Sequence, residues 1–464
     1  MSDTFDAIII GAGQAGPPLA GRLARAGMSV AVIERHLVGG TCVNTGCMPT
    51  KTLVASAYAA HLARRSRDFG IVIDGEVRID FRRVMARAQT VATNARTGLR
   101  RWLTELPGCT LIEGHARFES PQTVRVGARL LSAPKIFINV GARASLPEFP
   151  GVHAVPTLNN STILDLQELP RHLIVVGGSY VGLEFAQIFR RLGAAVTIVE
   201  KGPRLIARED PDISTRVQDI LASEGIAIRT GAECIRLAPH AEGAIVAVDC
   251  EEGAPEIAGS HVLLAVGRTP NTADLGLDSA GVVVNERGYI EVDETLATNV
   301  PGIWALGECN GHGAFTHTAY NDFEIVAANL LDHDTRRLSD RVPGYALYID
   351  PPLGRAGMTI AQARATGRRL LVGTRPMDRV GRAIEKGETQ GVMQIVVDAQ
   401  SHEILGAAIL GVGGDEAIHG VLDMMNAEAA YPVLQRAVPI HPTVSELIPT
   451  LLSDLQPLDQ TAPD

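Results

Sequence analysis

Aromatic residues, positive charge and long apolar runs are all scarce in this sequence. Aromatic side chains make up only 4% of the 464 residues, which argues against a surface that stacks single-stranded bases. The formal net charge of -10 disfavours binding to phosphate backbones, so we expect no nucleic-acid partner. No apolar run is long enough to span a membrane, and the first residues lack a secretion signal. We therefore expect a cytoplasmic protein with no membrane partner.

Cysteine is also rare, with six residues in the chain. A reducing compartment disfavours structural disulfides. Four cysteines are scattered singly, and we expect them to be small buried hydrophobes: Cys109, Cys234, Cys250 and Cys309. The other two, Cys42 and Cys47, are five positions apart and need a separate explanation.

The overall composition is that of a folded protein. Hydrophobic residues make up 46% and charged residues 20%, and the length suits roughly three domains. The 47 glycines are more than average composition gives, which indicates many tight turns or close approaches of the backbone to a ligand.

An internal repeat organises the first half of the chain. Phe5–Arg35 and His172–Lys201 each contain an apolar strand, a glycine turn, an amphipathic helix and a second strand. Each second strand ends in an acid, Glu34 or Glu200. The acid follows the first glycine of its turn by 23 positions in both copies. This is the βαβ fingerprint of a dinucleotide-binding fold, present twice.

Each position of the fingerprint has a physical role. The first glycine makes the turn, the second lets the backbone approach a pyrophosphate, and the third lets the helix pack on the strand. The acid accepts hydrogen bonds from a ribose. The first copy has Gly11, Gly13 and Gly16, and the second has Gly177 and Gly182 with Ser179 between them. One such fingerprint also occurs in segments that bind nothing, but two with equal spacing favour two dinucleotides, FAD and NAD(P)H.

The fold class predicted from this pattern is α/β, with two Rossmann-like dinucleotide-binding domains and a C-terminal α+β domain. We expect residues 1–148 to bind FAD and 149–268 to bind NAD(P). Residues 269–340 return to the FAD or central domain, with a helix from Thr316 to Leu331, and 341–464 form the α+β domain. We expect the polar tail, 456–464, to fray.

The segment GGTCVNTGCMPTK, Gly39–Lys51, carries the cysteine pair and precedes a predicted helix over 50–65. The spacing of Cys42 and Cys47 can bring two sulfurs within bonding distance. Zinc is one alternative, but it usually requires a second pair of ligands, and none is present. A structural disulfide is another. A redox-active pair near a flavin is the interpretation we favour, because a helix N-terminus lowers the pKa of a cysteine thiol and so favours the nucleophilic thiolate.

With this segment the whole chain resembles a class I pyridine nucleotide-disulfide oxidoreductase. The resemblance implies that Cys47 is the charge-transfer thiolate against the flavin and Cys42 is the interchange thiol that meets the substrate. It implies that Lys51 lies near flavin N5 and pairs with Glu184 in GGSYVGLE. Tyr180 matches the tyrosine that gates the nicotinamide pocket. The chain has only four lysines against 38 arginines, so Lys51 is not background composition.

The resemblance also implies further cofactor-binding residues. Ala116 in GHARF corresponds to a backbone contact near the adenine. GIWALGECNG resembles the second FAD motif, but it ends in Glu308 where the family usually has Asp, which puts the ribityl contact in question. Other residues expected to bind the cofactors are Thr41, Gly141, Gly267, Thr316 and His317.

The segment HPTVSE, 441–446, taken alone, could be a surface turn in which Thr443 or Ser445 caps a helix. Beside the redox segment it resembles the family's acid-base pair. His441 would then come from the partner subunit, and Glu446 would orient its ring. This implies a homodimer with shared active sites, in which the α+β domain is the dimerisation domain. We expect no metal ligand set in the protein.

The resemblance leaves the electron acceptor open. Ser179, REDPDIS (208–214) and YIDPPLGRAGMT (348–359) resemble mercuric-reductase-like enzymes, but no vicinal cysteine pair follows Cys309. Dihydrolipoamide dehydrogenase is the main alternative; glutathione reductase and a non-catalytic flavin-binding redox sensor are less favoured. The acceptor can be a disulfide, a metal ion or another small electrophile. Glu200 predicts that NADH is preferred to NADPH, although nearby basic residues leave NADPH possible.

Overall fold

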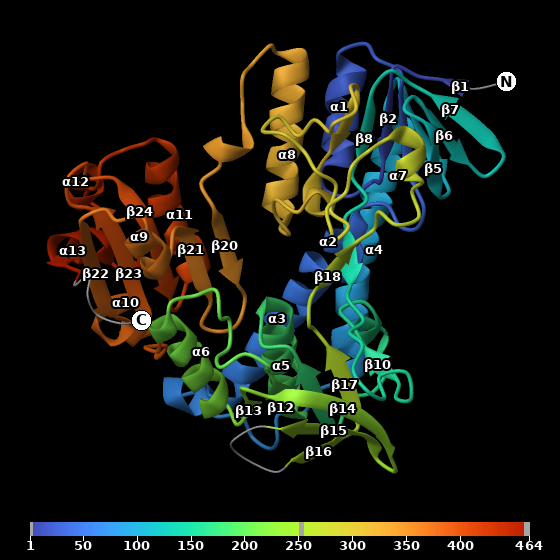
Figure 1. Cartoon of the computed structure of the whole chain (residues 1–464). Helices are drawn as coiled ribbons and strands as arrows, with labels where there is room; N and C mark the ends of the chain where they lie inside the picture. Colours follow the sequence, from blue (N-terminus) through green and yellow to red (C-terminus); the bar gives the residue numbers. More distant parts are fainter. Residues whose placement is uncertain (1–2, 250–254, 459–464) are drawn as a thin grey trace. The chain divides into compact units, whose positions relative to one another are not determined.

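The computed structural model describes residues 3–249 and 255–458 of the chain. They divide into two units, whose helices and strands carry the labels used in Figure 1. The first comprises Met1–Thr52, Met85–Ser145 and Gly267–Arg341; the second comprises Leu53–Val84, Leu146–Val266 and Val342–Asp464. Helices α3 (Cys47–Arg64) and α4 (Phe81–Glu105) each contain one of the divisions. The four-part domain division expected from the sequence stays a prediction.

The first glycine turn follows the central strand of a parallel sheet in the first unit. The strand order is β19-β8-β2-β3-β4, and each neighbouring pair is parallel. Successive side chains of a strand point to opposite faces, and those of β2 enter two different core clusters. The strands are β2 (Ala7–Ile10), β3 (Val30–Glu34), β4 (Cys109–Glu113), β8 (Ile136–Ile138) and β19 (Ile303–Ala305). Burial on both faces explains why β2 is apolar throughout.

Two helices of the first unit pack side by side, α1 (Gly16–Arg25) and α8 (Thr316–Leu331) (Figure 1). Arg22 of α1 forms an ion pair of 2.5 Å with Asp332, just beyond the end of α8. The bounds of α8 are those predicted from the sequence. The other elements of this unit are β1 (Asp3–Thr4), β5 (Ala116–Ser120), β6 (Thr123–Val126), β7 (Arg129–Ser132), β9 (Ala142–Ala144), β18 (Arg268–Pro270), α2 (Gly40–Thr45) and α7 (Leu277–Ala280).

The second glycine turn follows the central strand of a similar sheet in the second unit. The strand order is β10-β17-β11-β12-β13, again all parallel. The strands are β10 (Thr157–Leu158), β11 (His172–Val176), β12 (Ala195–Val199), β13 (Ala227–Arg229) and β17 (His261–Leu264). The accompanying elements are α5 (Tyr180–Leu192), α6 (Pro211–Ser223), β14 (Glu233–His240), β15 (Gly243–Asp249) and β16 (Glu256–Gly259).

The C-terminal part of the second unit is an antiparallel sheet with helices, which makes it α+β as expected. The strand order is β20-β21-β24-β23-β22-β25. The strands are β20 (Gly344–Leu347), β21 (Leu353–Gly357), β22 (Leu370–Pro376), β23 (Val392–Asp398), β24 (Ile404–Leu410) and β25 (Gln456–Pro457). The helices are α9 (Ile360–Ala365), α10 (Gly381–Glu385), α11 (Gly414–Asn426), α12 (Tyr431–Gln435) and α13 (Leu447–Ser453). Every residue of β23 and β24 is buried.

The start of the C-terminal tail corrects one expectation. Gln456 and Pro457 do not fray but form β25, which pairs with Val372 and Leu371 of β22. Ladder hydrogen bonds satisfy the backbone there, although the side chains of β25 are polar or exposed. Residues 459–464, the rest of the predicted fraying tail, lie outside the described part of the chain.

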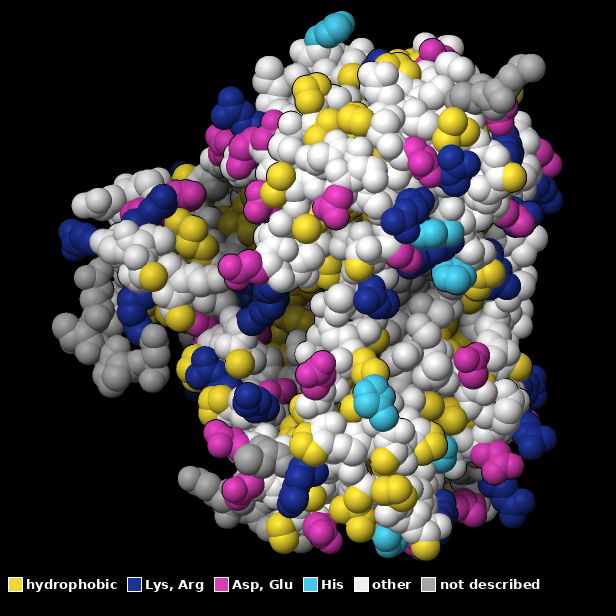
Figure 2. All heavy atoms as spheres, turned by 45° about the vertical axis from the view of Figure 1, so that its right-hand side comes forward, with side chains coloured by type: hydrophobic (Ala, Val, Ile, Leu, Met, Phe, Trp, Pro, Cys, Tyr) yellow, Lys and Arg dark blue, Asp and Glu magenta, His cyan; other side chains and the backbone are white. Residues whose placement is uncertain are grey.

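The surface shows no gathering of one charge sign on the face drawn in Figure 2, where basic and acidic side chains are interspersed. Within the described residues, no helix has both the length and the hydrophobicity needed to cross a bilayer.

Candidate functional site

A break between two helices brings the cysteine pair together. Cys42 lies in α2, and Cys47 is the first residue of α3. Gly46 separates the helices, and a Cβ there would lie 2.9 Å from the carbonyl oxygen of Thr41. Glycine therefore lets the chain turn back so that the second cysteine returns to the first. Both are free thiols; Cys47 is exposed and Cys42 is partly buried.

The environment makes the two thiols unequal. The pKa of Cys47 is lowered to about 6, mainly because Cys42 hydrogen-bonds to it. The Thr316 hydroxyl, 3.4 Å from the Cys47 sulfur, and the charge of Lys51 add to this shift, while burial opposes it. The same hydrogen bond and burial raise the pKa of Cys42. Near neutral pH the pair therefore consists of a Cys47 thiolate and a Cys42 thiol.

The remaining described cysteines offer no second reactive thiol. Burial raises the pKa of Cys109 to about 11 and that of Cys309 to about 12. Cys309 is buried as expected, whereas Cys109 is only partly buried. Cys250 and the side chain of Cys234 lie outside the described part. In the described chain, no three His, Cys, Asp or Glu side chains gather to hold a metal ion.

The first glycine turn has the open donors that a pyrophosphate needs. Backbone N–H groups of Gly13, Gln14 and Ala15 make no hydrogen bond to the described part of the chain. They lie immediately before α1, whose N-terminus carries a partial positive charge. A dinucleotide phosphate can use these donors without displacing a bond of the protein.

Each copy ends in an acid that holds its own turn. Glu34 accepts hydrogen bonds from the backbone N–H groups of Ala12, at 2.9 Å, and His36, at 2.8 Å. Glu200 accepts them from Gly178 and Gly202, the corresponding residues of the second copy. A carboxylate has room for further donors, so each acid can still accept a ribose hydroxyl.

The predicted ribityl contact, Glu308, is engaged within the protein. Arg268 binds both of its carboxylate oxygens, at 2.5 and 2.9 Å, and the Glu308 side chain is only 15% exposed. The preceding turn is fixed by Asp322, which accepts hydrogen bonds from the Gly307 N–H at 2.7 Å and the Asn310 side chain at 3.0 Å. The longer side chain therefore reaches an arginine, and the ribityl contact stays a prediction.

The other predicted cofactor residues of the first unit lie in its helices and strands or directly before them. Thr41 is exposed in α2, Ala116 is buried in β5, and Gly141 directly precedes β9. Gly267 precedes β18. His317 stacks on Phe315, with ring centroids 5.3 Å apart. Their contacts with cofactors stay predictions.

Tyr180 is the first residue and Glu184 the fifth residue of α5 in the second unit. Glu184 is buried and accepts a hydrogen bond of 3.0 Å from the Tyr348 N–H. Its predicted partner Lys51 belongs to the first unit, so their pairing stays a prediction. The Tyr180 ring packs edge-on against Tyr345, with centroids 5.4 Å apart.

The predicted acid-base pair is formed in the second unit. His441 Nδ1 lies 2.8 Å from Glu446 Oε2, and the histidine side chain is 81% exposed while the glutamate is 16% exposed. The carboxylate thus orients the ring through Nδ1, and Nε2 lies outside this contact. Beside the histidine, Val438 and Ile440 are among the most exposed large apolar side chains described.

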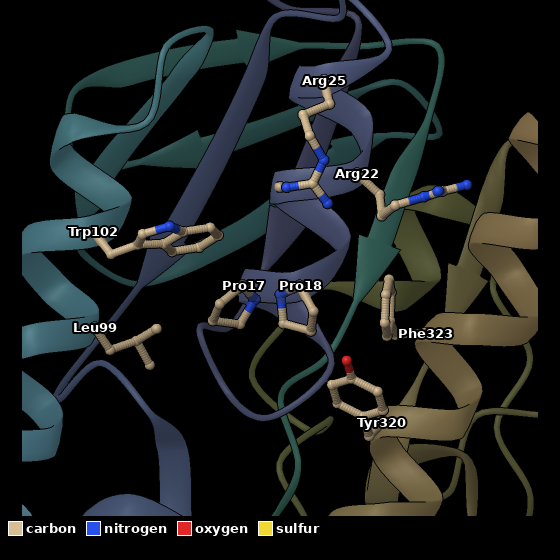
Figure 3. A pocket seen from close by; sticks show the side chains of 9 residues that line it. Pro17, Pro18, Arg22, Arg25, Leu99, Trp102, Tyr320 and Phe323 are labelled. Carbon is tan, nitrogen blue, oxygen red and sulfur yellow. The ribbon is translucent and has the colours of Figure 1, made fainter.

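The first unit also has a groove that is lined by residues other than those predicted for the site. It has a volume of about 500 Å³ and is bordered by α1, α4 and α8, with Pro17, Arg25, Trp102, Tyr320 and Phe323 among its walls (Figure 3). None of the predicted site residues lines it.

Sequence reasoning missed three residues that hold the site. Arg268 binds Glu308, Tyr345 packs on Tyr180, and Asn139 packs against the first glycine turn. Each is distant in sequence from its partner and follows no periodic pattern. The departure from Asp at Glu308 was the only signal, because a longer acid in this motif suggests a basic partner.

Comparisons with known proteins agree with this geometry. A family model described as pyridine nucleotide-disulphide oxidoreductase matches residues 5–322, and one for the dimerisation domain of that family matches residues 344–452. The probable pyridine nucleotide-disulfide oxidoreductase RclA of Escherichia coli (strain K12) is 38% identical over 458 residues, which are 97% of this chain and 99% of that protein.

More distant relatives include two enzymes considered above. The mercuric reductase of Streptomyces lividans is 31% identical, covering 96% of this chain and 94% of its own. The dihydrolipoyl dehydrogenase of Chlamydia muridarum (strain MoPn / Nigg) is 32% identical, covering 96% of each. The solved Cu(II) complex of the HOCl-induced flavoprotein disulfide reductase RclA from Escherichia coli matches with a TM-score of 0.88 and 36% identity, covering 98% of this chain and 99% of that one. The chain therefore belongs to the pyridine nucleotide-disulfide oxidoreductase family and carries its dimerisation domain.

Proposed function

We propose that this enzyme passes electrons from NADH through FAD to the Cys42–Cys47 pair, and from there to a disulfide, a metal ion or another electrophilic acceptor. The observation that carries the proposal is the unequal pair of thiols. A pair that is split into a thiolate and a thiol is set up for two different steps, whereas two buried neutral thiols would be inert.

The first unit has the donors to hold FAD. The open N–H groups before α1 suit its pyrophosphate, and Glu34 suits its adenosine ribose. When bound there, FAD would supply the two-electron chemistry that couples oxidation of NADH to reduction of the cysteine disulfide. Cleavage of that S–S bond leaves a Cys47 thiolate, and Cys42 takes up one proton. The hydrogen bond from Cys42, the Thr316 hydroxyl and the charge of Lys51 all stabilise this product.

A disulfide acceptor would be reduced in two thiol exchanges. Cys42 attacks one sulfur of the acceptor, and the other half leaves as a thiol that carries the Cys42 proton. The Cys47 thiolate then attacks the Cys42 sulfur, re-forms the internal disulfide and expels the second half as a thiolate, which takes its proton from solvent. Because the pKa of Cys42 is raised, its attack needs a base. The ring of His441, oriented by Glu446, can take the Cys42 proton and give it to the leaving thiol.

We propose that His441 reaches this chemistry in a homodimer. Val438 is 95% exposed and Ile440 is 80% exposed, an apolar pair that a second copy of the chain would cover. The dimerisation-domain match supports this partner. Each active site would then take its cysteines from one subunit and its histidine from the other.

We also propose a preference for NADH. If the Glu200 carboxylate accepts the nucleotide ribose, as its place in the second fingerprint predicts, it favours a free 2′-hydroxyl and repels a 2′-phosphate. Comparison of kcat/KM for NADH and NADPH tests the preference. A higher value for NADPH would show that the neighbouring basic residues dominate.

A spectroscopic experiment tests the roles of the cysteines. Cys42→Ser should leave a Cys47 thiolate beside the flavin and give a long-wavelength charge-transfer absorbance, while Cys47→Ser should have none. In the two-electron-reduced wild type, this absorbance should persist above about pH 6 and disappear as the pH falls through the Cys47 pKa. Equal spectra of the two variants would refute the assignment.

The acceptor is tested by NADH oxidation with lipoamide, glutathione disulfide, Hg(II), Cu(II), quinones and oxygen. Cu(II) belongs in the panel because a solved relative is a Cu(II) complex. With a disulfide, His441→Ala should lower turnover by roughly 10²–10⁴, the usual effect of removing a positioned acid-base group. Reduction of the flavin by NADH should be unchanged, and a metal-ion acceptor should depend only weakly on the histidine.

Subunit mixing tests the shared site. Cys42→Ser and His441→Ala homodimers should each lack disulfide reduction, for different reasons. Co-expressed subunits should regain activity, because each mixed dimer contains one site with an intact cysteine pair and an intact histidine. No recovery in purified mixed dimers would mean that both residues act within one chain.

A further inference from the structure

A buried polar cluster holds the ring of Tyr180, the first residue of α5. The two aromatic rings of Tyr180 and Tyr345 meet edge-on at an interplanar angle of 76°. The Tyr345 hydroxyl hydrogen-bonds to Glu209, and it also hydrogen-bonds to the Tyr180 hydroxyl. Tyr180 begins α5, the helix that follows β11 of the second parallel sheet, and Tyr345 lies on β20 of the C-terminal antiparallel sheet.

The direction of these bonds follows from the donors available. A tyrosine has one O–H to donate, and an ionised carboxylate can only accept. Tyr345 therefore donates to Glu209, and Tyr180 donates to the oxygen of Tyr345. Burial raises the pKa of Tyr180 to about 12, so its hydroxyl keeps its proton and remains a donor.

The far end of this chain of bonds is fixed. Glu209 is 2% exposed and also accepts from Arg355, which is 3% exposed. Arg355 lies 3.5 Å from Asp210, whose carboxylate accepts the backbone N–H groups of Ile360 and Ala361 at 3.0 Å each. Such a buried, well-satisfied network moves little, because any displacement leaves a charge unpaired.

We propose that Tyr345 is a positioning residue that latches Tyr180 over the nicotinamide pocket, so that NADH enters only after this hydrogen bond breaks. The inference rests on the proposed oxidation of NADH and on the predicted match of Tyr180 to the tyrosine that gates the nicotinamide pocket. If the Tyr180 side chain moves between a closed and an open position, a hydrogen bond that its hydroxyl makes only in the closed position must break when the pocket opens. NADH then binds only those molecules in which Tyr180 is in the open position. The apparent Kd for the nicotinamide is therefore the intrinsic Kd divided by the open fraction.

The test measures binding to the purified FAD-containing dimer by titration calorimetry. The probes are tetrahydro-NAD, which has a reduced nicotinamide but cannot transfer a hydride, and ADP-ribose, which has none. Tyr345→Phe keeps the ring contact and removes the hydroxyl. It should lower the Kd for tetrahydro-NAD by about threefold to tenfold, the range expected for one hydrogen bond, and leave the Kd for ADP-ribose unchanged.

A double variant sharpens the result. Tyr180→Phe removes the same bond from the other side, so Tyr180→Phe with Tyr345→Phe should bind no more tightly than either single variant. Tyr58→Phe is a matched control, because Tyr58 donates a hydrogen bond of 2.6 Å to Glu388, away from this cluster. It should change neither Kd.

The outcomes separate the latch from the proposed site. A raised Kd, additive effects, or equal shifts for both probes would overturn the latch. If Tyr180→Phe lowers the Kd and Tyr345→Phe does not, the latch fails while the proposed site stands. If Tyr180→Ala also leaves binding of tetrahydro-NAD unchanged, Tyr180 does not border the pocket, and the gating role predicted for it from the sequence fails too.

Discussion

The turn after β2 and the turn after β11 press their first glycines against the same kind of neighbour. A Cβ at Gly11 would lie 2.2 Å from the carbonyl oxygen of Asn139, and one at Gly177 would lie 2.4 Å from that of Ala265. Both glycines have positive φ, +106° and +117°. The strand beside the turn therefore leaves room only for glycine in both copies.

The third glycines and the acids also correspond. A Cβ at Gly16 would lie 2.4 Å from the carbonyl oxygen of Gly11, and one at Gly182 would lie 2.2 Å from that of Gly177. Glu34 and Glu200 accept backbone N–H groups at matching positions. These features are explained by atoms of the protein alone.

The middle residue of the turn differs between the two copies. Comparing them shows whether the fold itself or a bound ligand requires a glycine at this position. A Cβ at Gly13 would lie 3.3 Å from the Asn139 side-chain nitrogen, which is tight but not prohibitive, and 3.8 Å from two Asn139 oxygens, which is ordinary contact. The second copy has Ser179 at this place, with no side-chain cap bond to α5. The second copy thus accommodates a side chain at the middle position, and we expect that the glycine of the first copy serves mainly the predicted dinucleotide.

The largest expected effect comes from the first glycines. Gly11→Ala should destabilise the first unit by at least about 3 kcal/mol, because a positive φ and a backbone clash add together, and the purified protein should lose its flavin. Gly177→Ala should lose reduction by NADH but retain flavin. Flavin absorbance per protein and anaerobic reduction by NADH measure the two losses.

Two glycines in open space serve as controls. Gly98 in α4 and Gly420 in α11 would each place a Cβ with no atom within 4 Å, and neither has a positive φ. Their alanine variants should retain flavin and NADH reduction. If Gly177→Ala lost flavin as completely as Gly11→Ala, the two turns would not serve separate dinucleotides.

Local sequence signals predict the parts of this comparison that rest on backbone geometry. The two glycine turns, their acids and the helix Thr316–Leu331 follow from short-range spacing and periodicity. The bidentate Arg268–Glu308 pair joins residues 40 positions apart, and Arg355–Glu209 joins residues 146 apart. No periodic pattern marks such pairs, because only the folded sheets bring them together.

The cysteine segment likewise has one feature that the sequence predicts and another that depends on contacts made only in the fold. Its spacing suggests two nearby sulfurs, but the inequality of the thiols depends on the break at Gly46 and on Thr316, which is 269 positions from Cys47. The family resemblance implies different roles for the two cysteines, and the three-dimensional contacts explain why their thiols differ in pKa.

An intermediate effect is expected from the acids. In Glu34→Gln and Glu200→Gln one carboxylate oxygen becomes an NH₂ group that faces a backbone donor, so one of two hydrogen bonds is lost. Glu34→Gln should weaken FAD retention about tenfold, and Glu200→Gln should raise the Kd for NADH about tenfold while flavin stays bound.

Glu200→Gln should also reduce the discrimination between NADH and NADPH, because the charge that repels a 2′-phosphate is gone. The ratio of the two kcat/KM values measures this change. An unchanged ratio would mean that the acid acts only on the turn and that other residues select the nucleotide.

The smallest expected effect is an exchange of the middle residues. Ser179→Gly removes a hydroxyl that caps no helix, so nothing in the protein loses a partner, and the free energy of unfolding should change by less than about 0.5 kcal/mol. The Kd for NADH should change by less than about threefold.

Gly13→Ser should also leave the protein folded, since the nearest atom to a Cβ is a side-chain nitrogen. It should nevertheless weaken FAD retention more than Ser179→Gly affects NADH, because the first turn lacks a side chain where the phosphates approach. Denaturant unfolding and flavin release during dialysis measure the two quantities. If Gly13→Ser unfolds the protein, the middle glycine is a demand of the fold, and the contrast between the two turns does not report on their ligands.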